Sequence, residues 1–263
     1  MLLATALIGA VSGLIVSSWQ GFKDPPWEGF FVRKFMRSIL VGAGAGVGFF
    51  LADARGLVAL DNLGVLAFAI VAVERIIGES YKGFLRPGAH PEYHILLRRL
   101  RLPVRFYGAK LLLGGGFLVG VYYLVRLFAW LAERLIAWSD SLTLAGAAVG
   151  LVSGVLVAVG GALKDSQFEG FLPRKFIRSP IVGLVAGSLF VHLTASPFLL
   201  VLACIGGERA GVECYKTFLR RQVRGIFAGL PPRYPRWLAV RFVFGILYGL
   251  AVGLSIVLLL VNR

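Results

Sequence analysis

The chain has 263 residues, of which 58% are hydrophobic and 16% are charged, and its formal net charge is +15. Soluble domains carry charge on about a quarter of their residues, so this composition excludes an ordinary soluble protein. It indicates an integral membrane protein.

Apolar runs follow one another along the chain and predict its transmembrane helices. We expect an all-α, polytopic fold with about eight spans, in which interfacial residues extend the shorter runs. In chain order the runs cover residues 2–19, 39–51, 63–73, 111–125, 142–163, 181–191, 198–207 and 242–261. We expect the first run to be a retained helix rather than a signal peptide, because no positively charged segment precedes it.

Two charged motifs each occur twice in this apolar chain. The KD motif reads KDPPWEGFFVRKFMRS at residues 23–38 and KDSQFEGFLPRKFIRS at 164–179, with ten of sixteen positions identical. The ER motif reads ERIIGESYKGFLR at 74–86 and ERAGVECYKTFLR at 208–220, with eight of thirteen positions identical. This pattern predicts a tandem duplication of a four-helix unit.

The expected repeats are residues 1–131 and 142–263, joined by an outer interfacial connector at 132–141. A repeat with four spans returns the chain to the side from which it started, so both copies have the same orientation. We therefore expect a pseudo-twofold axis along the membrane normal.

Basic residues are concentrated in the loops that hold the motifs. These loops and the segments beside them contain 24 of the 28 Lys and Arg residues. Such a positive-inside pattern predicts that the motifs are cytoplasmic and that both termini are outside, and we expect a prokaryotic plasma membrane. Because topology explains the basic excess, the expected partners are the bilayer and its anionic headgroups, and not nucleic acid.

Two of the predicted spans are short. Runs 39–51 and 198–207 would extend about 20 Å and about 15 Å as helices, whereas the hydrocarbon core is about 30 Å thick. We expect the charged motifs to dip into the membrane at these places. Short segments at matching positions of two halves point to a binding site.

Helical phase separates the charges of the ER motif into two stripes. One stripe predicts an intrahelical ladder of ion pairs. Its members are Arg75, Glu79, Lys82 and Arg86, and in the second half Arg209, Glu213, Lys216 and Arg220. Glu74 shares a different stripe with Tyr81, as Glu208 does with Tyr215, and these glutamates have no ladder partner on their own helix.

An ionised carboxylate at helix depth costs a few kcal/mol, so Glu74 and Glu208 are expected to meet cations from elsewhere. The nearest candidates are Lys34, Arg37, Lys175 and Arg178. The full candidate set for substrate binding or ion pairing is Lys23, Asp24, Glu28, Lys34, Arg37, Glu74, Tyr81, Lys164, Asp165, Glu169, Lys175, Arg178, Glu208 and Tyr215. The alternative is that these residues only staple the KD motif to the third span, and the two roles can coexist.

Glycines spaced by four residues predict close approach of helix backbones. They are Gly9 and Gly13, Gly116 and Gly120, Gly146, Gly150 and Gly154, and Gly245, Gly249 and Gly253. Cys204 and Cys214 are ten residues apart on one predicted helix, so they cannot form a disulfide with each other. No group of residues has metal-ligand or triad spacing, so we expect no metal, no cofactor and no catalytic residue.

Three classes of function fit these features. We rank first a membrane transporter or channel for a small solute or ion, with a polar cytoplasmic site built from both copies of the motifs. A non-enzymatic membrane scaffold or assembly protein comes second. An integral membrane enzyme acting on a lipid phosphate headgroup comes third, because such enzymes need one asymmetric constellation rather than a duplicated one.

Overall fold

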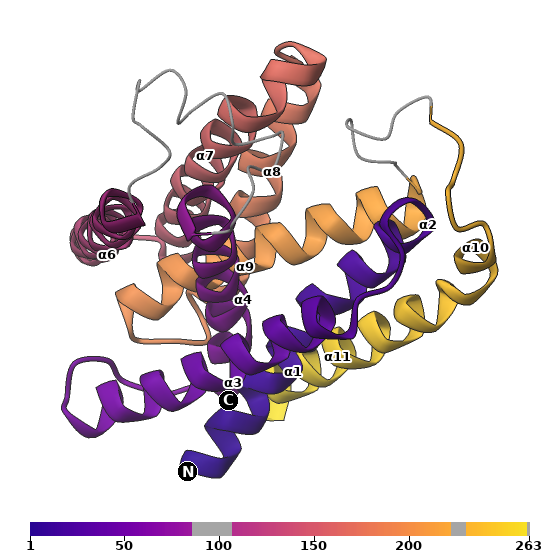
Figure 1. Ribbon diagram of the computed structural model, residues 1–263. Helices are drawn as coiled ribbons and strands as arrows, with labels where there is room; N and C mark the ends of the chain where they lie inside the picture. Colours follow the sequence, from indigo (N-terminus) through magenta and orange to yellow (C-terminus); the bar gives the residue numbers. More distant parts are fainter. Residues whose placement is uncertain (86–106, 222–229, 262–263) are drawn as a thin grey trace.

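The architecture comes from a computed structural model that describes residues 1–85, 107–221 and 230–261, without the side chains of residues 85, 107 and 164–169. Over these ranges the chain forms helices and turns and no strand (Figure 1). The prediction of an all-α fold is confirmed.

Eight helices of the described chain have 18 residues or more. They are α1 (Leu2–Lys23), α3 (Val32–Ala54), α4 (Leu63–Ser80), α6 (Tyr107–Trp138), α7 (Leu142–Glu169), α8 (Pro173–Phe190), α9 (Pro197–Cys214) and α11 (Phe242–Val261). Of the two short helices, α2 (Pro25–Glu28) lies within the KD motif of the first half and α10 (Arg236–Val240) contacts α2. Two π-helical turns, η1 (Tyr81–Leu85) and η2 (Tyr215–Leu219), continue α4 and α9.

Five segments are long and apolar enough to cross a membrane. They are Leu2–Lys23, Val32–Ala54, Gly108–Trp138, Leu142–Leu163 and Arg236–Val261. The other long helices, α4, α8 and α9, have 18 residues each and contain three charged residues each. The chain is thus a helical membrane protein, and the charged residues of α4, α8 and α9 keep these three helices from qualifying by composition.

The helices α1 and α11 run antiparallel, so both termini lie at one end of this pair (Figure 1). At the opposite end, the ring of Phe22 lies 6.0 Å from that of Phe242. We call this the motif end, because the KD motif begins there, and the other the terminal end. At the terminal end the loops before α4 and α9 are joined, because Thr194 Oγ1 donates to Asp61 Oδ1 at 2.8 Å.

Glycines allow two pairs of helices to pack backbone against backbone. A Cβ added to Gly9 in α1 would overlap the carbonyl oxygen of Gly42 in α3. A Cβ added to Gly150 in α7 would likewise overlap the carbonyl oxygen of Gly183 in α8. Gly150 lies 141 positions after Gly9, and Gly183 lies 141 positions after Gly42. Close packing was predicted at these glycines and is confirmed.

The same prediction is wrong for α6 and for part of α11. No described atom of another element lies within 4 Å of a Cβ added at Gly116, Gly120, Gly249 or Gly253. These four glycines lie on faces that the other described helices leave uncovered, so their spacing does not serve packing among the described residues.

The helices α4 and α9 pack against each other at the centre of the fold. A Cβ added to Gly206 in α9 would overlap the carbonyl oxygen of Phe68 in α4. The fully buried core includes Val65, Leu66 and Ile70 from α4 and Leu199, Leu200 and Val201 from α9. The central pair carries charged residues and packs against α1, α6, α7, α8 and α11, which separates those charges from lipid.

The helix α6 differs from the expected layout. It continues without interruption through residues 132–138, so the segment expected to be a separate connector is the end of this 32-residue helix. A helix of that length extends about 48 Å, longer than the hydrocarbon core of about 30 Å. Trp130 and Trp138 are exposed on it, and such aromatic residues suit the headgroup region.

Candidate functional site

The two glutamates singled out from the sequence are buried in the central helix pair. Glu74 of α4 is 1% exposed and Glu208 of α9 is 0% exposed. Neither oxygen of Glu208 has a hydrogen-bond partner among the described residues, and the same holds for Glu74 Oε2. Buried polar groups are normally hydrogen-bonded, so both carboxylates depart from the rule.

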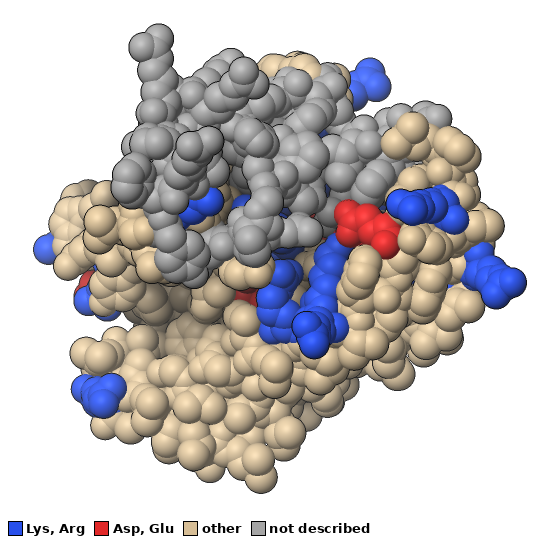
Figure 2. Space-filling view, in the orientation of Figure 1, with Lys and Arg blue, Asp and Glu red and all other residues tan. Residues whose placement is uncertain are grey.

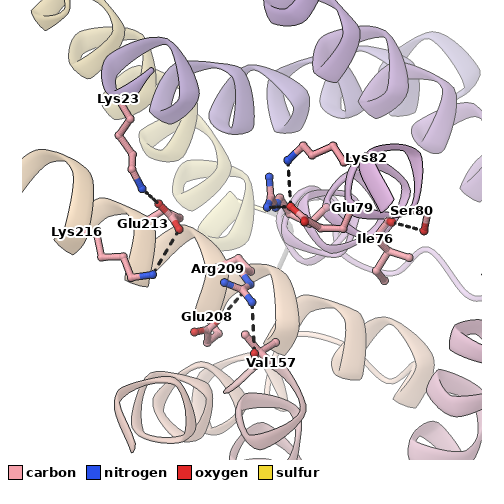
Figure 3. A network of polar contacts seen from close by, with 11 residues as sticks. Lys23, Ile76, Glu79, Ser80, Lys82, Val157, Glu208, Arg209, Glu213 and Lys216 are labelled. Carbon is pink, nitrogen blue, oxygen red and sulfur yellow. Dashed lines mark hydrogen bonds and ion pairs between the residues drawn. The ribbon is translucent and has the colours of Figure 1, made fainter. Parts of the chain in front are cut away.

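The predicted ladder is present on α4. Glu79 forms ion pairs with Arg75, one turn earlier, and with Lys82 Nζ at 3.1 Å (Figure 3). The guanidinium of Arg75 also lies over the ring of Trp19, 5.9 Å from its centroid. Arg86, the remaining member of this ladder, lies outside the described residues.

The second-half ladder is different. Lys216 Nζ lies 3.8 Å from Glu213 Oε1, as the spacing predicts. Arg209 turns to other partners: its Nε lies 3.6 Å from Glu208 Oε2 and its Nη2 donates to the carbonyl oxygen of Val157 at 3.4 Å. The cation that meets Glu208 is therefore its own neighbour in sequence, held against α7 (Figure 3).

An ion pair joins the first KD motif to the second half of the chain. Lys23 Nζ, at the end of α1, lies 3.0 Å from Glu213 Oε2 in α9 (Figure 3). Glu213 thus lies between Lys23 and Lys216. Sequence reasoning had assigned Glu213 only to its intrahelical ladder, because periodicity along one helix does not reveal which neighbouring helix will face it.

Lys34 is held inside its own motif. Its Nζ lies 2.6 Å from Asp24 Oδ2 and 2.9 Å from Glu28 Oε2, and the Asp24 side chain is 3% exposed. The chain reverses direction at Gly29, whose φ of 81° favours glycine, and this turn brings α2 against the start of α3. Lys34 therefore meets the acids of the KD motif. The side chains of Lys164, Asp165 and Glu169, the corresponding positions of the second half, lie outside the described part.

The two arginines of the KD motifs have different surroundings. Arg37 lies over the ring of Tyr81, 5.3 Å from its centroid, in a cation–π contact. The corresponding Tyr215 instead accepts a hydrogen bond from Arg220 Nε at 2.7 Å. Arg178 lacks the aromatic contact that Arg37 has, and its buried Nε has no hydrogen-bond partner among the described residues.

A pocket of about 60 Å³ opens between α7, α8 and α9. Four cations line it, namely Lys175, Arg178, Arg209 and Lys216. The hydroxyl of Ser179, another lining residue, lies beside the Glu208 carboxylate without forming a well-oriented hydrogen bond. Figure 2 shows Lys and Arg side chains gathered near the middle of one face, above a broad surface of uncharged residues.

Metal binding finds no support in the described residues, which contain no group of three His, Cys, Asp or Glu that could hold an ion. Both cysteines are free and lie on α9, as the sequence predicts.

The fold and these charges define a helical integral membrane protein with an ionic cluster inside its bundle. Comparison with protein families, with curated protein sequences and with solved structures finds no match. The function is therefore argued from the cluster and the pocket beside it.

Proposed function

We propose that this protein is a membrane transporter or channel for a small solute or ion, with its polar site near the motif ends of α4 and α9. The observation that carries the proposal is the Glu208 carboxylate, which is 0% exposed and lacks hydrogen-bond partners among the described residues. It lies next to a pocket lined by basic side chains.

In the Lys34 group, Asp24 and Glu28 each accept a hydrogen bond from Lys34 Nζ, whereas neither oxygen of Glu208 has a partner among the described residues. An unsatisfied buried polar group costs about 1–3 kcal/mol, and a charged one costs more. The Arg209 guanidinium, 3.6 Å away, offsets the charge of Glu208 but does not supply a hydrogen bond. A proton, a cation or water would complete this carboxylate, and exchange of such a species is the elementary step of transport.

The proposed architecture has eight spans in two tandem four-helix repeats, related by a pseudo-twofold axis along the membrane normal. The glycine contacts of α1 with α3 and of α7 with α8, 141 residues apart, support this arrangement. The central packing of α4 on α9 supports an axis that passes between them. The motif end would face the cytoplasm of a prokaryotic cell and the termini would lie outside, as the basic loops favour.

A membrane scaffold is the second candidate, and the Lys23–Glu213 pair favours it. This ion pair joins residues from the two halves, as a contact that holds an assembly together would do. A scaffold requires no solute movement, so flux separates the two candidates.

The test is flux through purified protein in liposomes, with proton, alkali cation, chloride and phosphate gradients. We expect Glu208→Gln to lower the flux at least about tenfold, with Glu74→Gln doing the same if both halves take part. Glu133→Gln, on the exposed surface of α6, is the matched control and should leave flux unchanged. Flux that is absent in the wild type, or equal in all three variants and the wild type, contradicts the proposal.

A further inference from the structure

We infer that the pocket between α7, α8 and α9 binds an oxyanion of the phosphate class, either free or carried by a lipid headgroup. The inference deepens the proposed function, on which its role as a substrate site rests. The binding itself is argued from charge, geometry and shape.

The charge of the cluster is not balanced. Glu213 is shared by Lys23 and Lys216, and Glu208 is paired with Arg209. The described lining of the pocket contains no acidic residue, and Arg178 has no ion pair among the described residues. Cations enclosed among helices are costly without counter-charge, and a bound anion supplies it.

Arg178 provides the donor geometry that an oxyanion needs. Its Nε is buried against the pocket and has no hydrogen-bond partner among the described residues. A guanidinium presents its N–H groups in a planar fork that matches two oxygens of a phosphate. Arg209 and Lys216 line the same pocket from α9 and from η2, so donors converge from two sides.

Apolar residues line the pocket together with the basic ones. Phe171 and Leu172, which directly precede α8, belong to the lining and are exposed, at 60% and 42%. Phosphate itself would use only the basic residues, whereas an anionic lipid would also place its glycerol and acyl carbons against these apolar side chains. The two sources share the phosphate chemistry and differ in their use of Phe171.

The corresponding place in the first half holds its arginine differently. The pocket there is smaller, about 20 Å³ against about 60 Å³, and its described lining includes Lys34 and not Arg37. Arg37 is engaged by the Tyr81 ring, whereas Arg178 Nε has no hydrogen-bond partner among the described residues. Strong oxyanion binding is therefore expected in the second half and not in the first.

The experiment uses the full-length protein in phosphatidylcholine nanodiscs, titrated calorimetrically with inorganic phosphate. A second arm measures retention of phosphatidylglycerol relative to phosphatidylcholine by native mass spectrometry. Arg178→Gln should weaken phosphate binding or lipid retention at least about tenfold, the loss expected of one charge-assisted hydrogen bond. Arg37→Gln, at the corresponding position of the first half, is the matched control and should leave binding unchanged. Arg178→Lys keeps the charge, so its affinity for the probe should lie between that of Arg178→Gln and that of the wild type.

Each outcome decides the inference. Phosphate binding that depends on Arg178 supports a free oxyanion, and selective retention of phosphatidylglycerol that depends on Arg178 and on Phe171 supports a headgroup. Wild-type protein that binds neither probe overturns the inference without recourse to variants, and so does equal weakening by Arg178→Gln and Arg37→Gln. Binding without flux supports this inference and contradicts transport. Flux of another solute without binding of either probe contradicts this inference and supports transport.

Discussion

Lys23 Nζ and Glu213 Oε2 lie 3.0 Å apart, although 190 residues separate them in the sequence. Both side chains are mostly buried, with 14% and 13% exposure. The pair connects the end of α1 to α9, and Glu213 also contacts Lys216. One carboxylate therefore joins the KD motif of the first half to the ER motif of the second.

This pair should contribute measurable coupling energy. We expect Glu213→Gln to lower stability by about 2–4 kcal/mol, since it leaves Lys23 and Lys216 without the carboxylate that they share. Lys23→Met should cost less, because Glu213 keeps Lys216. The double variant should lose less than the sum, with a coupling of about 1 kcal/mol or more. Urea unfolding in detergent micelles measures this cycle, and additive losses would show that the two groups do not interact.

The tight approach of α7 to α8 should not tolerate a larger residue. We expect Gly150→Ala to cost about 1–3 kcal/mol, because its Cβ would overlap the carbonyl oxygen of Gly183 and push the helices apart. Gly160→Ala, on the same helix with no described neighbour within 4 Å, should be neutral or stabilising by up to about 1 kcal/mol. Melting midpoints in detergent provide the comparison, and equal midpoints for the two variants would contradict the close contact.

The Lys34 triad should stabilise the turn at Gly29. Replacing Lys34 by Gln removes the cation that Asp24 and Glu28 both contact, and Asp24 is almost fully buried. We expect Lys34→Gln to lower the free energy of unfolding by about 2–3 kcal/mol. Adding Asp24→Asn and Glu28→Gln to this variant should restore part of the lost stability. If the restored variant melts no higher than Lys34→Gln alone, the triad is not the cause.

The cysteines report on topology. Cys204 is fully buried in α9, whereas Cys214 is partly exposed ten residues closer to the motif end. In single-cysteine variants we expect a membrane-impermeant maleimide to label Cys214 only in inside-out vesicles, and Cys204 in neither orientation. Labelling of Cys214 from the outer face of intact cells would reverse the proposed orientation.

Features that depend on a single helix could be predicted from the sequence. The ladder of Arg75, Glu79 and Lys82 follows from helical spacing, and both of its contacts are present. The close packing at Gly9 and Gly150 follows from the spacing of small residues. The partners in the ladder lie within two turns of each other, and the close packing requires only that the glycines lack a side chain.

Features that depend on how helices meet could not be predicted. Glu213 accepts Lys23 because α1 and α9 converge at the motif end, and no local pattern encodes that convergence. The phase argument assumed an unbroken α-helix through the ER motif, but a π-helical turn begins at Tyr81 and changes the angle per residue for the positions that follow it. Arg37 then lies over Tyr81, and Lys34 lies in the turn formed at Gly29.

The central position of α4 and α9 has a consequence for biogenesis. A helix with three charged residues inserts poorly by itself, because each costs about 2.5–3.5 kcal/mol at mid-membrane, while each large aliphatic residue returns only about 0.3–0.6 kcal/mol. Yet α4 leaves the ribosome long before α9, the helix against which it finally packs. A nascent chain that ends before residue 197 should therefore stay at the translocon or bind a chaperone, and the bundle should close only after translation has passed α9.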